Sequence, residues 1–92
     1  MLYMIHCVDQ PDSLDVRKAN RDAHLAHLKA HGDHLYAAGP LLGDDGETMI
    51  GSLLLIDFPG RAAVDAFLAA DPYNKAGLFA RVEVAPWKKL LP

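Results

Sequence analysis

The segment Leu2-Tyr3-Met4-Ile5-His6-Cys7-Val8 decides the fold. Successive residues of a β-strand point to opposite faces of a sheet, so the even-numbered and odd-numbered residues form two separate rows. Both rows are apolar here, with His6 as the only exception. A sheet with one face in water should alternate apolar and polar residues along each strand. This segment therefore predicts a strand in a sheet whose two faces are both covered.

The same two-sided apolar pattern returns in Leu53–Ile56, within a longer predicted strand over Glu47–Phe58. Two more segments complete a set of four strands. Leu35–Ala38 is short and ends at a glycine-proline pair, and Phe79–Ala85 alternates two valines with an arginine and a glutamate. The turn-forming sequence Gly-Asp-Asp-Gly at 43–46 separates the second strand from the third.

A first helix is predicted over Leu14–His31, where small apolar residues recur at steps of three and four. Asp12 or Ser13 could cap its first turn, and Gly32 stands where such a helix commonly stops. The recurring residues are Val16, Ala19, Ala23, Ala26 and Ala30.

A second helix is predicted between the third and fourth strands. It should end at Asp71-Pro72, because the residue before a proline avoids helical geometry. One further helical turn is expected over Pro72–Leu78. The apolar stripe of this second helix consists of Ala62, Ala63, Ala66, Phe67 and Ala70.

The resulting order, β-α-β-β-α-β, predicts a ferredoxin-like α+β fold, with a four-stranded antiparallel sheet and both helices on one face. The helices cover one of the two apolar faces and leave the other without cover. A second copy of the chain is the simplest partner for a self-complementary apolar face. We therefore expect a homodimer in which two sheets pack together as a dimeric α+β barrel.

Composition limits the classes of function. The 92 residues fit a single domain over 1–92, and a net charge of −3 without a basic cluster argues against nucleic-acid binding. No apolar run approaches the roughly 18 residues of a membrane span. Cys7 is the only cysteine, so no internal disulfide forms, and its apolar neighbours predict a buried thiol rather than a nucleophile. We expect a cytoplasmic protein without a signal peptide.

Three of the five histidines share the first predicted helix. His24, His27 and His31 are spaced i, i+3 and i+7, so they lie on about the same face but extend over about 10 Å of helix. That span is too long for all three to bind one metal ion. His27 and His31 could bind one together, but we expect them instead to form a polar flank near solvent or the subunit boundary. We expect no metal site.

His24 is of more interest because Asp71 follows the second helix. Both helices lie on the same face of the predicted sheet, so a residue in the middle of the first can approach the end of the second. A carboxylate beside an imidazole selects one tautomer and favours the charged ring, which suits a general acid or base. The alternative is that Asp71 only caps the following turn and His24 is a partly exposed helix residue.

Three other residues could line a cleft beside this pair. Pro40 lies at a strand end, where backbone groups could form a pocket edge. Ser52 lies within a strand and could donate a hydrogen bond, although it does not lie on a nucleophile elbow. Tyr73 and Trp87 are large side chains with polar ends, which could line a pocket or the dimer contact, or could simply pack.

Taken together, these segments resemble the YCII-related family. The resemblance rests on five stretches in order: Arg21–Leu28, Gly39-Pro40-Leu41, Gly51-Ser52, Asp71-Pro72-Tyr73 with Ala76-Gly77-Leu78, and Val84 with Pro86-Trp87. It covers nearly the whole chain and implies a dimeric α+β barrel. It also implies an active site built around His24 and Asp71, with Pro40, Ser52 and Tyr73 lining the same cleft.

The resemblance does not determine the reaction. A related enzyme eliminates HCl from a chlorinated hydroxyhydroquinone, and similar barrels include isomerases and small monooxygenases. We expect a cofactor-independent enzyme that uses the His24–Asp71 pair for acid–base chemistry on a small polar, cyclic or aromatic molecule. A domain that binds a small ligand without turnover, and a structural oligomer without a pocket, remain as alternatives.

Overall fold

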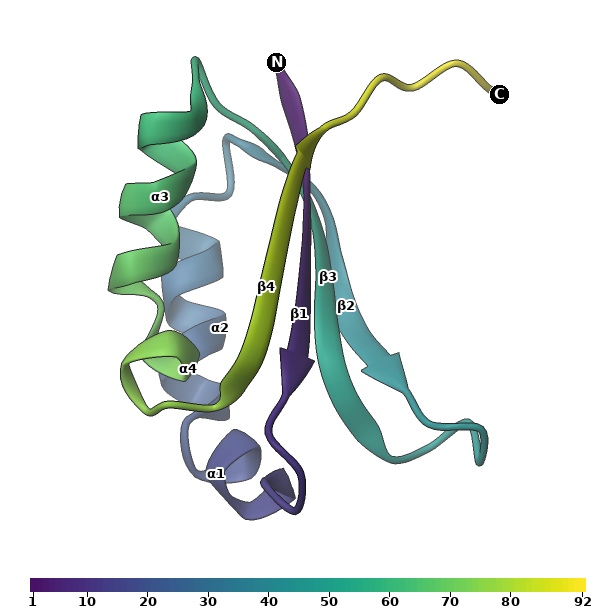
Figure 1. Ribbon diagram of the computed structural model, residues 1–92. Coiled ribbons are helices and arrows are strands. Elements are labelled where there is room, and N and C mark those ends of the chain that lie inside the picture. The colour runs from purple at the N-terminus through teal and green to yellow at the C-terminus, as the bar shows by residue number, and fades with distance from the viewer.

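Four antiparallel strands form one sheet in the spatial order β2-β3-β1-β4. The computed structural model describes residues 1–92, and all helices lie on one side of the sheet (Figure 1). This arrangement confirms the predicted ferredoxin-like α+β fold. In chain order the elements are β1 (Leu2–Asp9), α1 (Leu14–Ala19), α2 (Arg21–Ala30), β2 (Leu35–Leu42), β3 (Met49–Asp57), α3 (Arg61–Ala70), α4 (Pro72–Lys75) and β4 (Phe79–Pro86).

The core lies between the sheet and the helices. The odd-numbered residues of β1 point into it, and the even-numbered residues of β3 face the same side because Ile5 pairs with Leu54. Burial follows the two-residue period of a strand. The core cluster consists of Tyr3, Ile5, Cys7, Leu28, Leu54, Ile56, Phe58, Val64, Phe67 and Leu68.

The strand bounds differ from the predicted ones at the hairpin of β2 and β3. β2 continues through Pro40, where a strand end was predicted. It can do so because β2 is an edge strand, where a proline does not have to donate a hydrogen bond to a neighbour. β3 starts later than predicted, since Asp45 accepts hydrogen bonds from the backbone of Glu47 and Thr48 and holds both in the turn. The Thr48 hydroxyl and these backbone groups lower the pKa of Asp45 to about 2.

The single helix predicted over Leu14–His31 is in fact two helices, α1 and α2, separated at Asn20. The Asn20 side chain donates a hydrogen bond to the carbonyl of Val16, and local bonds of this kind compete with regular helix geometry. The turn predicted over Pro72–Leu78 is shorter as well. α4 ends at Lys75, and Gly77 then adopts a positive φ of 72°, a conformation that glycine tolerates best.

The faces that the helices turn inward also differ from the apolar stripes predicted for them. In α1 and α2 all four alanines are exposed, and the buried side chains are Arg17, His24 and Leu28. In α3 the buried residues are Val64, Phe67 and Leu68, so only Phe67 of the predicted stripe is buried. Buried polar groups on a helix are costly unless they are paired, so the inner face of α1 and α2 marks a specialised region.

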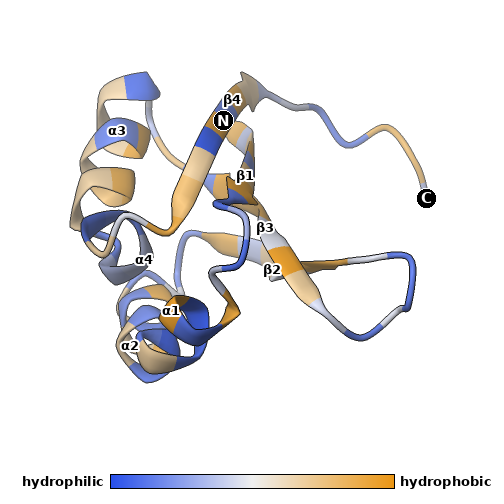
Figure 2. Cartoon of the chain, turned by 60° about the horizontal axis from the view of Figure 1, so that its bottom comes forward, coloured by the Kyte–Doolittle hydropathy of each residue, from blue (hydrophilic) through white to orange (hydrophobic).

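The second face of the sheet carries no helix (Figure 1). On this open face β1 and β3 present apolar side chains, and Leu53 is 40 % exposed. Apolar colours extend along the strands, while the loop between β2 and β3 is hydrophilic (Figure 2). None of the helices is long and apolar enough to cross a membrane.

Cys7 should resist alkylation while the protein is folded. Burial is the main cause that raises the pKa of its thiol to about 12, with the negative charge of Asp71 adding to the effect. Only the thiolate reacts, so at pH 8 we expect iodoacetamide to label Cys7 about a hundredfold or more slowly than the same protein in denaturant. Mass spectrometry measures both rates. Equal labelling of the folded and unfolded protein would contradict the burial.

Candidate active site

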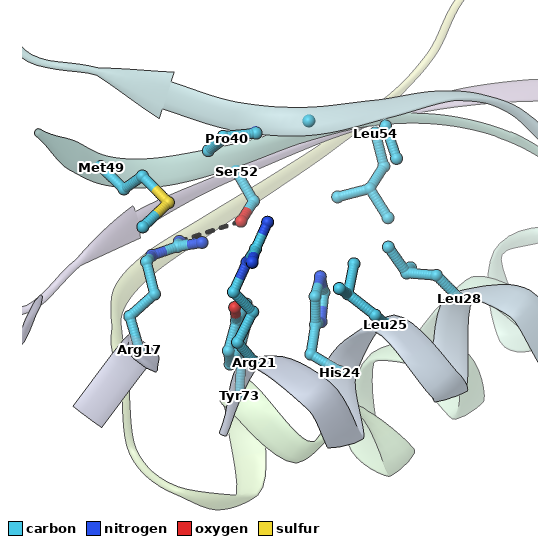
Figure 3. Close-up of a pocket in the computed structure, with 12 residues that line it drawn as sticks. Arg17, Arg21, His24, Leu25, Leu28, Pro40, Met49, Ser52, Leu54 and Tyr73 are labelled. Carbon is cyan, nitrogen blue, oxygen red and sulfur yellow. Dashed lines mark hydrogen bonds between the residues drawn. The ribbon is translucent and has the colours of Figure 1, made fainter. Parts of the chain in front are cut away.

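A cavity of about 140 Å³ lies between α1, α2, α4 and the inner face of β2 and β3. Figure 3 shows side chains from the helices extending toward the strands, where they meet side chains that the strands contribute. Leu25, Leu28 and Leu54 form an apolar wall at one end. The polar side chains that line it are Arg17, Arg21, His24, Ser52 and Tyr73.

His24 and Asp71 form a buried pair. The imidazole Nδ1 lies 2.9 Å from Oδ1 of Asp71, and their side chains are only 7 % and 3 % exposed. A carboxylate oxygen only accepts hydrogen bonds, so Nδ1 carries the proton, and in a neutral ring Nε2 is left as a lone-pair acceptor. Nε2 has no hydrogen-bond partner, whereas every fully buried side-chain nitrogen in the structure has one. Nε2 therefore has access to open space, as a general base requires.

Asp71 also has a structural role. The same oxygen, Oδ1, accepts a hydrogen bond from the backbone N–H of Tyr73 at 3.0 Å and caps α4. The two interpretations considered for Asp71 are therefore compatible. The cap holds the carboxylate in the orientation that the contact with His24 needs.

The ring of Tyr73 contacts the His24 imidazole and the Arg17 guanidinium. It stacks on the His24 imidazole with centroids 3.9 Å apart and planes 13° from parallel, and the Arg17 guanidinium carbon lies 4.7 Å from its centroid. Burial raises the pKa of Tyr73, although the positive charges of Arg17 and Arg21 oppose this effect. Tyr73 thus remains a neutral phenol that can donate a hydrogen bond.

Arg17 joins the cavity to the end of β1. Its Nε and Nη2 donate to the two carboxylate oxygens of Asp9 at 2.7 and 2.8 Å, and Nη2 also donates to Oγ of Ser52 at 3.0 Å. Burial alone would lower the pKa of the guanidinium, but the hydrogen bonds and charge of Asp9 outweigh it and the pKa is raised. Because the Ser52 oxygen accepts this bond, its hydroxyl hydrogen remains available to a ligand.

Of the residues predicted for the site, His24, Pro40, Ser52 and Tyr73 line the cavity, and Asp71 lies directly behind His24. The structure thus brings together all five predicted side chains. Trp87, the other large side chain considered, is 38 % exposed and lies outside this cavity.

Two arginines of the cavity and Asp9 were not predicted as site residues. The spacing of Arg17, Arg21, His24 and Leu28 contains the signal, because steps of four, three and four place residues on one side of a helix. All four line the cavity. The alanines of the same segment recur with a similar period, so the sequence pattern did not distinguish the row of cavity residues from the alanine face.

His27 and His31 do not project into solvent as a polar flank. Nε2 of His27 contacts the carbonyl of Phe67 at 3.0 Å, and the imidazole of His31 packs edge-on against the Phe67 ring. Both are half-buried and join α2 to α3. No group of three or more potential metal ligands occurs in the structure.

These features define a class of protein: a ferredoxin-like α+β domain with a buried imidazole–carboxylate pair at a small cavity. The YCII-related domain matches residues 1–88, so the chain belongs to the YCII-related family. It is 38 % identical to protein YciI of Escherichia coli O6:H1, with 98 % of this chain and 99 % of that protein covered.

Solved structures share the fold of this chain. The chain is similar to 5-chloro-2-hydroxyhydroquinone dehydrochlorinase (TftG) from Burkholderia phenoliruptrix AC1100, solved in complex with 2,5-dihydroxybenzoquinone. The TM-score is 0.88 and the identity 39 %, over 96 % of this chain and 94 % of TftG. An antibiotic biosynthesis monooxygenase aligns over 99 % of this chain and 100 % of its own with a TM-score of 0.59 but only 13 % identity, which shows a shared fold alone.

Breaking the buried Arg17–Asp9 pair should destabilise the protein strongly. Its side chains are 3 % and 7 % exposed, so Asp9→Asn leaves a buried guanidinium without its counter-charge. We expect a loss of about 3–5 kcal/mol in the free energy of unfolding, measured by urea denaturation.

The matched control is Asp65→Asn, which breaks the Arg61–Asp65 pair on the surface, where both side chains are more than half exposed. That change should cost about 0.5 kcal/mol or less. Equal losses in the two variants would contradict a buried structural role for Asp9.

Proposed function

We propose that the protein is a cofactor-independent enzyme that performs acid–base chemistry on a small polar ring compound, with His24 as the general base and acid. The observation that carries the proposal is Nε2 of His24, which has access to the cavity while Nδ1 is held by the buried Asp71. A second support is the similarity to TftG, a dehydrochlorinase with 39 % sequence identity.

In the proposed elimination, Nε2 of His24 removes a proton from the substrate. An aromatic substrate first forms its keto tautomer, in which the carbon that carries the leaving group takes up a proton and becomes tetrahedral. The proton that His24 removes comes from a ring hydroxyl. The electron pair of the broken O–H bond forms a C=O bond, the adjacent double bond shifts toward the tetrahedral carbon, and the leaving group departs with its own bonding pair. The imidazolium then returns its proton to solvent. Atoms and charge balance, and the step needs no external oxidant. Asp71 stabilises the imidazolium and preserves the correct tautomer, as a carboxylate does in other histidine-based sites.

Ser52, Pro40 and Tyr73 are proposed to bind and orient the substrate. The hydroxyl groups of Ser52 and Tyr73 can each donate a hydrogen bond to a ring oxygen. Pro40 forms part of the cavity wall on β2, next to Ser52 of β3. Fixed donors of this kind stabilise negative charge that develops on a substrate oxygen.

His24→Asn tests the mechanism. With 5-chloro-2-hydroxyhydroquinone as substrate, we expect chloride release to fall about 10²–10⁴-fold, which is the usual contribution of a positioned acid or base. Asp71→Asn should also slow the reaction while an asparagine still caps α4. His34→Ala is the control, since that residue is exposed and lies outside the cavity.

Wild-type rates in His24→Asn would exclude His24 as the base. If the wild-type protein binds the substrate and returns it unchanged, the cavity serves binding without turnover, and the proposal of an enzyme fails.

We also propose that two copies pair through the open face of the sheet. Support comes from the apolar rows of β1 and β3 on that face and from the exposure of Leu53 in a single chain. A domain of this size buries little surface alone, so a second copy would add to its stability.

We also place the protein in the cytoplasm, because the reduced thiol of Cys7 suits that compartment.

Leu53→Lys should separate the dimer, because it would place a charge within an apolar contact. We expect wild-type protein to sediment as a dimer and the variant to show at least about a hundredfold weaker association. Ala69→Lys, on the exposed side of α3, is the control and should remain dimeric. A monomeric wild type, or a dimeric Leu53→Lys, would rule out this interface.

A further inference from the structure

The charged groups around the cavity differ in their partners. The Arg17 guanidinium forms an ion pair with Asp9, and His24 contacts Asp71. Arg21 also lines the cavity, yet no ion pair or hydrogen bond joins its guanidinium to another group. Arg21 is therefore a cation at the cavity without an ion-pair partner of its own.

The side chain of Arg21 extends into this space. It rises from the first turn of α2 toward β3, between Ser52 and His24 (Figure 3). Its positive charge lowers the pKa of Tyr73, although burial dominates there, so its field reaches the ring that stacks on His24. Arg21 precedes His24 by three residues, so both project from the same side of the helix.

The size of the cavity limits what it can hold. A cavity of about 150 Å³ in another protein accommodates one benzene molecule, and this cavity measures about 140 Å³. Its apolar wall of Leu25, Leu28 and Leu54 suits the face of such a ring. The space therefore fits a single six-membered ring with few substituents.

We propose that Arg21 is the anion-binding residue of the site, and that the ligand is a monocyclic compound with an ionised oxygen such as a phenolate, enolate or carboxylate. This inference rests on the proposed active site and specifies its substrate class. A guanidinium presents two parallel N–H donors, so it can hold one or two oxygens of an anion in a defined orientation. The ring then lies against the leucines, within reach of Nε2 of His24.

Binding of benzoate and benzamide tests the proposal. The two probes have the same shape, but only benzoate is charged at pH 7. We expect the wild-type protein to bind benzoate at least about tenfold more tightly, measured by NMR titration. Arg21→Gln should remove this preference, and Arg21→Lys should retain part of it. Arg21 is exposed and unpaired, so these changes should not disturb folding.

Lys29→Gln is the matched control. Lys29 is an exposed cation on the same helix that does not line the cavity, so its loss lowers the net charge equally and should leave the preference unchanged. If Arg21→Gln still favours benzoate, if the wild type binds both probes alike, or if it binds neither, the proposal is wrong.

The test of Arg21 can fail or succeed independently of the test of the proposed enzyme activity. Preference for the anion that depends on Arg21, without chloride release by the wild type, would support this inference and reject the elimination. Chloride release with an unchanged KM for 5-chloro-2-hydroxyhydroquinone in Arg21→Gln would support the elimination and reject the role of Arg21.

Discussion

One carboxylate oxygen, Oδ1 of Asp71, connects the parts of the structure on which the site depends. It accepts hydrogen bonds from His24 on α2 and from the backbone of Tyr73 at the start of α4. A buried carboxylate is stable only where such partners satisfy it. Its position therefore orients the imidazole, and through α4 it places the Tyr73 ring flat against that imidazole. Arg17 then lies against Tyr73 and reaches Asp9 and Ser52.

This polar network lies where a small domain would ordinarily place apolar side chains. α1 and α2 turn Arg17 and His24 inward, so much of the apolar core comes from the sheet and α3. Breaking such buried pairs is costly, and replacing them with apolar residues is often neutral or favourable. Their presence in a chain of 92 residues thus points to function rather than stability. The second apolar face of the sheet offers a way to recover buried area through a partner copy.

The sequence predicted the sheet and its topology well. The element order β-α-β-β-α-β indicated the ferredoxin-like arrangement, and a strand that is apolar on both sides, as Leu2–Val8 is, indicated a sheet covered on both faces. The sequence predicted the helix faces poorly. Alanine is a strong helix former in solvent as well as in a core, so its period marks a helix without showing which side is buried. The extension of β2 through Pro40 depended on its place at the sheet edge, which only the assembled topology reveals. His24 and Asp71 are 47 residues apart in the chain, and the prediction that they pair rested largely on the family resemblance.

The proposed roles of Arg21 and His24 would link binding to proton transfer. Both residues line one small cavity, so an anionic ring held by the Arg21 guanidinium would lie beside the imidazole. A positive charge that forms on the imidazole during proton transfer would then face two negative charges, that of Asp71 and that of the bound anion. A neutral ring of the same size would leave only the charge of Asp71 to stabilise it. Selectivity for an ionised substrate would therefore arise in the proton-transfer step as well as in binding.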